Sequence, residues 1–279
     1  MIMTAQGTIK IMAYRCLFVL IGLLGLGQTG FVVPVKSETI VPIIDAATGQ
    51  LYGGVSGNNW LSAEDTEDFV KKKLIFHAYA RDGSFLQNTT MHSAQTSEGC
   101  SNPTFLPKES LPQNAVTLVG APWNAALRKP RELDTSSPIY REALTFWLRE
   151  QGVDDLQPNL SQLWRIDLEG DGRDEVLIAA VRHRGSETST QAGDYSLLLL
   201  RKLIDGVVVT FPVILDFFSE ICIAECALEQ HEIISVLDLN GDGKLEIITR
   251  SSGYESITQT VFSIEDFRIK KRLEWTCGS

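Results

Sequence analysis

Asp167-Leu-Glu-Gly-Asp-Gly-Arg-Asp-Glu and Asp238-Leu-Asn-Gly-Asp-Gly-Lys-Leu-Glu are one nine-residue motif written twice, with starting points 71 residues apart. The two stretches are identical at six of their nine positions. Each has an acid or an amide at positions one, three, five and nine, and glycine at positions four and six. Short loops of this composition wrap oxygen ligands around a hard cation such as calcium. The motif therefore predicts a metal-binding loop, and its duplication predicts a repeated structural unit.

The ligands of the cation follow from the positions in the motif. Glycine at the sixth position permits the sharp turn that brings the ligands together, and the seventh residue offers its backbone carbonyl. The carboxylates of so small a turn repel one another unless a cation neutralises them. We expect Ca²⁺ to be bound by Asp167, Glu169, Asp171, Glu175 and the carbonyl of Arg173 in the first loop, and by Asp238, Asn240, Asp242, Glu246 and the carbonyl of Lys244 in the second.

The residues that flank the two loops predict strands and exclude an EF-hand. An EF-hand needs glutamate at its twelfth position between two helices, whereas Ile178 and Thr249 stand at the twelfth positions here. Segments rich in Val, Ile, Leu and Thr predict strands at 160–166, 175–182, 195–203, 206–215, 231–238, 245–250, 256–264 and 267–276. Four strands follow four strands, with a metal loop after the first strand each time. This pattern favours antiparallel propeller blades or a related β-sheet stack.

The N-terminal half, residues 37–157, predicts a mixed α/β region. Strands are expected at 74–80 and 116–120, and a flexible turn at 53–57. Ser62 and Asp65 have the spacing of a capping box, which indicates a short helix that ends before Lys71. A Ser-, Asn- and Pro-rich stretch at 88–113 predicts a long loop that Cys100 could anchor.

One helix, at 138–151, is predicted most clearly. Ser137 suits the N-cap, Pro138 suits the first helical position, and Gly152 suits the left-handed position after the last turn. Its apolar stripe consists of Ile139, Tyr140, Ala143, Leu144, Trp147 and Leu148. The whole chain is therefore expected to be mainly β with a minor α component, an α+β composition. Its parts are an N-terminal segment (1–36), a mixed region (37–157) and two β-repeats (158–279).

The N-terminal segment predicts export. Lys10 and Arg15 precede an uncharged apolar run at 16–27, which is typical of a secretory signal peptide, and an uncleaved membrane anchor is the alternative. Four cysteines remain after this segment, and an exported chain favours disulfides. They allow three pairings, and we expect Cys277 to pair with Cys222 or Cys226 rather than with Cys100.

The net charge of −10 argues against a nucleic-acid partner, because the phosphate backbone repels an acidic surface. An unknown protein or carbohydrate ligand is expected instead, and contact with a membrane only through an N-terminal anchor. Trp60 and Trp123 follow turn residues and are the aromatic candidates for sugar contact, whereas Trp147, Trp164 and Trp275 are expected in the core.

The stretches that carry a family resemblance are WRIDLEGDGRDEVLIAAV (164–181) and VLDLNGDGKLEIITR (236–250). They resemble FG-GAP or VCBS-type repeats, the calcium-loop blades of integrin-α-like propellers and of many exported bacterial proteins. The resemblance covers residues 160–279 and implies calcium in the loops and a propeller-like fold. A full propeller has four to eight blades, so further blades would have to come from residues 37–135 or from another subunit.

The sequence contains no clear catalytic group. None of His77, His92, His183 and His231 has the partner spacing of a metalloprotease helix, and each is expected to be a surface or structural residue. We therefore expect a binding or structural module rather than an enzyme. The alternative is a secreted hydrolase with its catalytic acids in the N-terminal region.

Overall fold

Three antiparallel sheets make up most of the regular structure in this computed structural model, which describes residues 39–72, 74–92, 95, 98–224, 226–265 and 268–278. Residues 38–279 form one compact unit. The expected export segment, 1–36, lies outside the described residues. The prediction of a mainly β chain with a minor α component and antiparallel sheets is confirmed.

The three sheets are named here in chain order. The first sheet has the strand order β3-β2-β1-β6-β4-β5, the second β11-β10-β9-β8-β7 and the third β12-β13-β14-β15. The strands of the first sheet are β1 (Val41–Asp45), β2 (Leu51–Ser56), β3 (Asn59–Leu61), β4 (Phe76–Ala80), β5 (Phe85–Thr89) and β6 (Ala115–Val119). Those of the second are β7 (Arg131–Glu132), β8 (Leu160–Ile166), β9 (Glu175–Arg182), β10 (Asp194–Ile204) and β11 (Val207–Phe218). Those of the third are β12 (Gln230–Leu237), β13 (Glu246–Ser252), β14 (Ser256–Glu265) and β15 (Arg268–Gly278).

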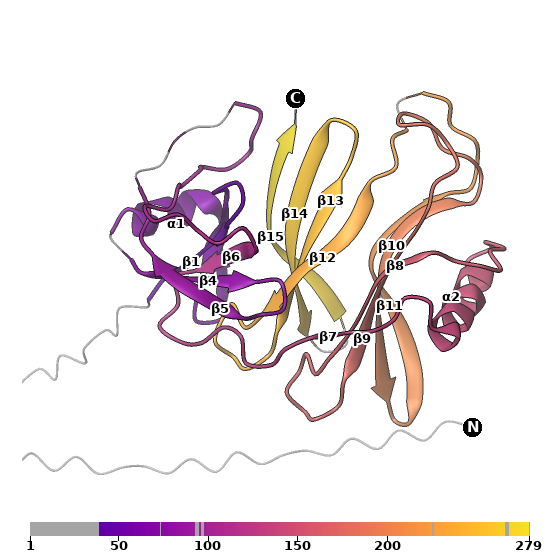
Figure 1. Ribbon diagram of the computed structural model, residues 1–279, viewed down its shortest axis with the longest axis horizontal. Helices are drawn as coiled ribbons and strands as arrows, with labels where there is room; N and C mark the ends of the chain where they lie inside the picture. Colours follow the sequence, from indigo (N-terminus) through magenta and orange to yellow (C-terminus); the bar gives the residue numbers. More distant parts are fainter. Residues whose placement is uncertain are drawn as a thin grey trace, which may run out of the picture. The chain divides into compact units, whose positions relative to one another are not determined.

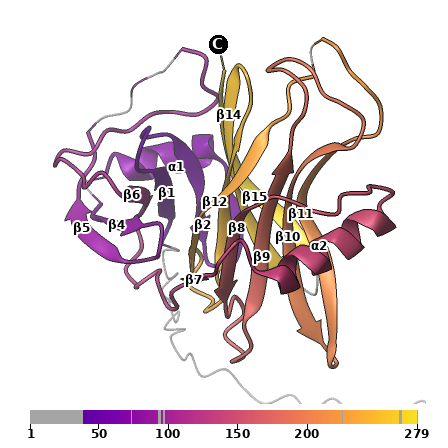
Figure 2. The same ribbon diagram turned by 45° about the vertical axis from the view of Figure 1, so that its right-hand side comes forward.

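The third sheet lies between the other two (Figures 1 and 2). One apolar cluster joins it to the first sheet, and a second cluster joins it to the second sheet. Ile247 and Ile248, consecutive in β13, illustrate this arrangement, because Ile247 faces the second sheet and Ile248 the first. Both are fully buried, which stabilises the fold by about 1.5–3 kcal/mol for each side chain. A sheet that is covered on both faces explains why its sequence reads as continuous apolar runs.

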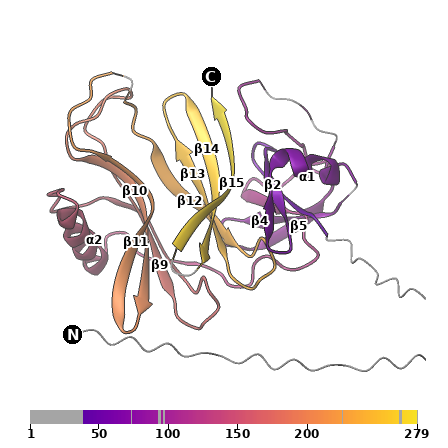
Figure 3. The same ribbon diagram turned by 180° about the vertical axis from the view of Figure 1, so that it is seen from behind.

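The two helices cover the outer faces of the stack. Helix α1 (Ala63–Val70) covers the first sheet, and helix α2 (Pro138–Glu150) covers the second (Figure 3). The predicted start of α1 is confirmed, since the Ser62 hydroxyl accepts a hydrogen bond from the amide of Asp65 at 3.1 Å. Among the described residues, none of the helices is long and apolar enough to span a bilayer.

Helix α2 ends as predicted, with Gly152 in the left-handed region at φ = 83°. Its buried stripe is narrower than expected. Leu144 and Leu148 are buried and Tyr140 and Trp147 half-buried, whereas Ile139, in the first turn, is 71% exposed. The predicted burial of Ile139 is therefore wrong.

The eight strands predicted after residue 158 are confirmed with shifts of no more than three residues at their ends. Each of the two repeats forms a four-stranded meander, β8–β11 and β12–β15. The hairpin predicted at Asp205-Gly206 is also confirmed, with both residues at positive φ.

The flexible turn predicted at 53–57 is wrong, because this stretch is mostly buried strand β2. A Cβ atom on Gly54 would lie 2.8 Å from both the Thr66 methyl group and the Val41 carbonyl oxygen. The glycine therefore permits α1 and β1 to approach β2 closely. A glycine inside a strand often marks such a close approach of another part of the backbone.

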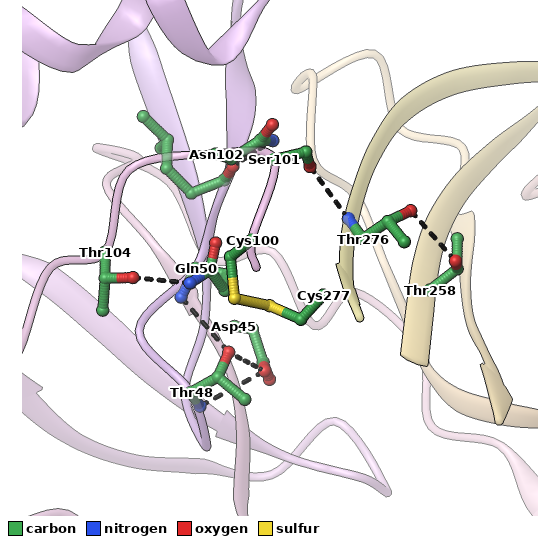
Figure 4. Close-up of a disulfide and its surroundings, with 11 residues drawn as sticks. Asp45, Thr48, Gln50, Cys100, Ser101, Asn102, Thr104, Thr258, Thr276 and Cys277 are labelled. Carbon is green, nitrogen blue, oxygen red and sulfur yellow. Dashed lines mark hydrogen bonds between the residues drawn. A yellow bond between two sulfur atoms is a disulfide. The ribbon is translucent and has the colours of Figure 1, made fainter. Parts of the chain in front are cut away.

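The structure also corrects the expected cysteine pairing, since Cys277 is bonded to Cys100 (Figure 4) and Cys222 is bonded to Cys226. The Cys100 loop lies beside the end of β15, where the amide of Ser101 donates to the carbonyl of Thr276 at 2.8 Å. The amide of Gly278 donates to the carbonyl of Gly99 at the same distance. The Cys100–Cys277 disulfide therefore joins the long loop of the first half of the chain to the third sheet. This agrees with the prediction that Cys100 anchors that loop.

Candidate metal-binding loops

The two acidic loops occupy equivalent places in the two meanders. The first loop, residues 167–174, connects β8 to β9, and the second, residues 238–245, connects β12 to β13. Both turns lie at the same edge of the stack, the lower edge in Figure 1. The fourth and sixth positions are glycines at φ = 74° and 83° in the first loop and at 77° and 87° in the second. Side chains other than glycine rarely adopt this backbone conformation, so the glycines of the motif are a requirement of the turn.

The first aspartate of each loop organises the turn through the same hydrogen bonds. Asp167 accepts from the amide of Gly170 at 2.7 Å and from that of Gly172 at 2.9 Å. Asp238 accepts from Gly241 at 2.7 Å and from Gly243 at 3.1 Å. In each turn one carboxylate thus accepts from the amides of both glycines. The repeat seen in the sequence is therefore also a repeat of the hydrogen-bond pattern.

The fifth-position aspartates also match between the loops. Asp171 accepts from the amide of Arg173 at 2.9 Å, and Asp242 accepts from that of Lys244 at 2.8 Å. These bonds hold each aspartate over the seventh residue, whose carbonyl is the expected backbone ligand.

The glutamate at the ninth position of each loop is buried. Glu175 and Glu246 are each 2% exposed, and each accepts from the amide of the second loop residue at 2.8 Å, Leu168 and Leu239 respectively. Burial, reinforced by the neighbouring aspartates, raises the pKa of Glu175 to about 7 and that of Glu246 to about 8. Burial likewise raises the pKa of Asp238. A nearby cation is the usual means by which such a buried site holds its charged form.

The third position differs between the loops. Glu169 forms an ion pair with the largely buried Lys202 of β10, whereas Asn240 stays within its loop, with its amide nitrogen 3.1 Å from Asp242. Glu169 is therefore engaged outside the first loop, although the sequence predicts it as a ligand. In the described part of the chain, the carboxylates of neither loop form a group of three with one oxygen each within 4.8 Å of one another.

The two loops lie side by side, which the sequence does not predict. The amide of Leu245 donates to the carbonyl of Leu168 at 2.8 Å. The Arg128 guanidinium reaches both loops, because it donates to the carbonyl of Asp167 at 2.5 Å and to that of Gly243 at 2.8 Å. Arg128 comes from the connection between β6 and β7, so a segment of the N-terminal half joins the two turns.

The same connection places Trp123 against the second loop. Its indole nitrogen donates to the carbonyl of Asp238 at 3.0 Å, and its ring covers Gly241, whose added Cβ would lie 3.1 Å from the ring. Trp60 is half-buried against the cluster that joins the first and third sheets. These two aromatics are therefore half-buried rather than exposed, and their contact with a sugar stays a prediction. Trp164 and Trp275 are buried as predicted, and Trp147 is half-buried.

The hydrolase alternative requires a pair of carboxylates in a cleft, and a polar cavity of about 430 Å³ contains two glutamates in its lining. Glu132 and Glu232 line it, but Glu232 lies 4.0 Å from the Arg81 guanidinium and 3.4 Å from that of Arg250. Trp60 and Trp123, the aromatics expected beside such a pair, do not line this cavity. Its described lining therefore gives the hydrolase alternative no specific support.

Comparison with family models, with curated proteins and with solved structures found no match to this chain. The resemblance to calcium-loop repeats therefore rests on the residues of the two loops and on the strands around them.

Proposed function

We propose that this is an exported calcium-binding β-repeat protein, in which Ca²⁺ in the two loops stabilises a binding or structural module. The observation that carries the proposal is the repetition of one hydrogen-bond pattern around Asp167 and around Asp238. The two turns share these amide contacts and a buried glutamate at the ninth position, so they are equivalent in structure as well as in sequence.

The buried glutamates supply a physical reason for a cation. Glu175 and Glu246 lie among the aspartates of their loops, so their charged forms are costly in the absence of a counter-ion. Calcium takes six to eight oxygen ligands in flexible geometry, which suits carboxylates, an amide oxygen and backbone carbonyls gathered in one turn. Small movements of the acidic side chains would complete such a shell.

The second loop is the better site. Its third residue, Asn240, stays within the loop, whereas Glu169 of the first loop is held by Lys202. We infer that calcium binds first in the loop that begins at Asp238. Binding in the loop that begins at Asp167 requires Glu169 to leave the Lys202 ammonium and to contact the calcium ion instead.

Calcium at these positions would stabilise the second and third sheets together. The loops are the first turns of the two meanders, and Arg128 bonds to both of them. We infer that the meanders are divergent relatives of propeller blades and that the first sheet, which lacks the motif in its described residues, takes the place of a third blade. A protein or carbohydrate ligand is the proposed partner, and two disulfides agree with an exported chain.

Thermal unfolding of the purified protein tests the proposal, first in saturating calcium, then in excess chelator, with magnesium as the ion control. A ligand at 100 times its Kd stabilises the folded state by about 2.7 kcal/mol, which corresponds to roughly 5–10 °C for a chain of this size. Asp242→Asn should remove most of this gain. The matched control is Asp205→Asn, which removes a carboxylate from the β10–β11 turn, outside both loops. Equal melting temperatures in calcium and chelator would refute the proposal.

A further inference from the structure

A second group of possible metal ligands lies at the opposite edge of the stack from the calcium loops, near the connection between β11 and β12, at the top in Figure 1. Asp216 lies in β11, Glu229 directly before β12, and His231 is the second residue of β12. One ligand atom of each lies within 4.8 Å of the other two. Among the histidines, cysteines and acids that the structure describes, these three residues form the one group whose ligand atoms all lie within 4.8 Å of one another.

The ring of His231 is fixed by contacts on both nitrogens. Its side chain is 2% exposed, with Nε2 2.9 Å from Asp216 Oδ2 and Nδ1 2.8 Å from the hydroxyl of Ser251. Ser251 is the partner of His231 in the β12–β13 pairing, so the sheet itself sets this contact. When Nδ1–H donates to Ser251, the lone pair of Nε2 faces Asp216, and a carboxylate oxygen of Glu229 lies within 4.8 Å of the ligand atoms of both other residues. A metal-ligating histidine typically has such a hydrogen bond on its other nitrogen.

Strand register also positions Asp216. Asp216 is opposite Ser196 in the β10–β11 pairing, and the hydroxyl of Ser196 accepts from the backbone amide of His231 at 3.2 Å. The connection that carries Glu229 is closed by the Cys222–Cys226 disulfide, and Cys222 exchanges two backbone hydrogen bonds with Thr190. Asp216 and His231 therefore come from the second and third sheets and are held by strand register, whereas Glu229 comes from the connection that leads into β12.

We propose that Asp216, Glu229 and His231 bind a divalent transition-metal ion of the zinc class. One imidazole nitrogen and two carboxylate oxygens form a donor set that suits Zn²⁺, whereas calcium takes oxygen ligands only. The two negative charges balance the ion, and three protein ligands leave a fourth position for water or for a ligand atom. Solvent reaches the group from two sides, because Glu229 lines a surface recess of about 380 Å³ and His231 lines the cavity of about 430 Å³.

Zn²⁺ binding to the untagged protein in saturating calcium tests this proposal, measured by competition with a chromophoric chelator. Saturating calcium keeps the acidic loops from taking the zinc. We expect one tight equivalent of zinc per chain. Cobalt substituted for zinc should give visible absorption bands from the bound ion. The chain has four histidines, and His231 is the one that lies in this group, so these bands should depend on His231.

Variants of the three ligands separate this site from non-specific binding. Glu229→Gln and Asp216→Asn change half-buried side chains, so both variants should fold, and each should weaken zinc binding by at least about tenfold. His231→Asn should remove the tight equivalent and the cobalt bands. The matched control is Glu255→Gln, an exposed carboxylate that lines the same surface recess as Glu229. The proposal is overturned if no tight equivalent is found, or if Glu229→Gln and Glu255→Gln bind zinc equally.

Discussion

The amide of Leu245 donates a hydrogen bond to the carbonyl of Leu168 at 2.8 Å, and this bond directly joins two loops that are far apart in the sequence. Arg128 reinforces the junction through the carbonyls of Asp167 and Gly243. These three hydrogen bonds hold the backbones of the two loops against each other. The two candidate sites therefore form one structural unit.

Arg128→Ala should destabilise the protein by about 1–3 kcal/mol, because it removes the donor to carbonyls of both loops. It should also weaken calcium binding in both loops, since neither turn would be held against the other. Urea unfolding and calcium titration measure the two effects. Lys129→Ala is the matched control, because Lys129 contacts the exposed Ser84 hydroxyl and neither loop. If the Arg128→Ala variant loses calcium affinity in only one of the two loops, the loops do not form a shared unit.

Calcium should bind in two steps of different strength. Asp238→Ala should abolish the tighter step and Asp167→Ala the weaker one, because the third ligand of the first loop is paired with Lys202. Calorimetric titration of the wild type and of both variants distinguishes the steps. Equal affinities of the two loops would show that the ion pair of Glu169 has no influence.

The stability of the calcium-free protein should fall as the pH rises above about 5. Burial raises the pKa of Glu175 to about 7 and that of Glu246 to about 8, from 4.5 in the unfolded chain. A raised folded pKa contributes stability that is fully present below pH 4.5 and is lost as the pH rises through 7 and 8. The loss should be on the order of a few kcal/mol by pH 9 in chelator.

Calcium should reverse this trend, because the ion displaces the protons of both glutamates and so binds more tightly at higher pH. Urea unfolding across this pH range, with and without calcium, gives both curves. Glu246→Gln should flatten the curve measured in chelator. A calcium-free protein that gains stability between pH 5 and pH 8 would contradict the raised pKa values.

The two disulfides should differ in their effect on stability. Cys100–Cys277 closes a loop of 177 residues and Cys222–Cys226 one of 4 residues. Chain-entropy arguments give about 5 kcal/mol for the first and about 2 kcal/mol for the second. Denaturant unfolding of the Cys100→Ser/Cys277→Ser and Cys222→Ser/Cys226→Ser double variants compares them. A larger loss in the second variant would mean that the connection before β12 matters more than loop length.

Much of the fold after residue 158 could be predicted because the strands there are long, rich in branched apolar residues and separated by Gly-containing turns. The first sheet was harder. Strands β1, β3 and β5 have three to five residues, and β2 contains Gly53 and Gly54, which in a sequence indicate a turn. There Gly54 instead permits the close approach of α1, a contact that depends on tertiary structure.

The candidate loops could be predicted residue by residue because their chemistry is local. Their neighbours could not, since Arg128 and Trp123 reach the loops from 39 and 115 residues away. The ion pair of Glu169 with Lys202 and the grouping of His231 with Asp216 depend on strand register for the same reason. Spacing along the chain carries no information on such pairings.

The position of the third sheet between the first and the second also determines when the chain can finish folding. The first two sheets are made before it, yet the apolar face that each presents to the interior has no cover until β12–β15 arrive. During synthesis these faces would therefore remain open to solvent and to chaperones. Residues 230–265 and 268–278 complete both interiors, so a chain cut short before them would expose two apolar faces and be prone to aggregate.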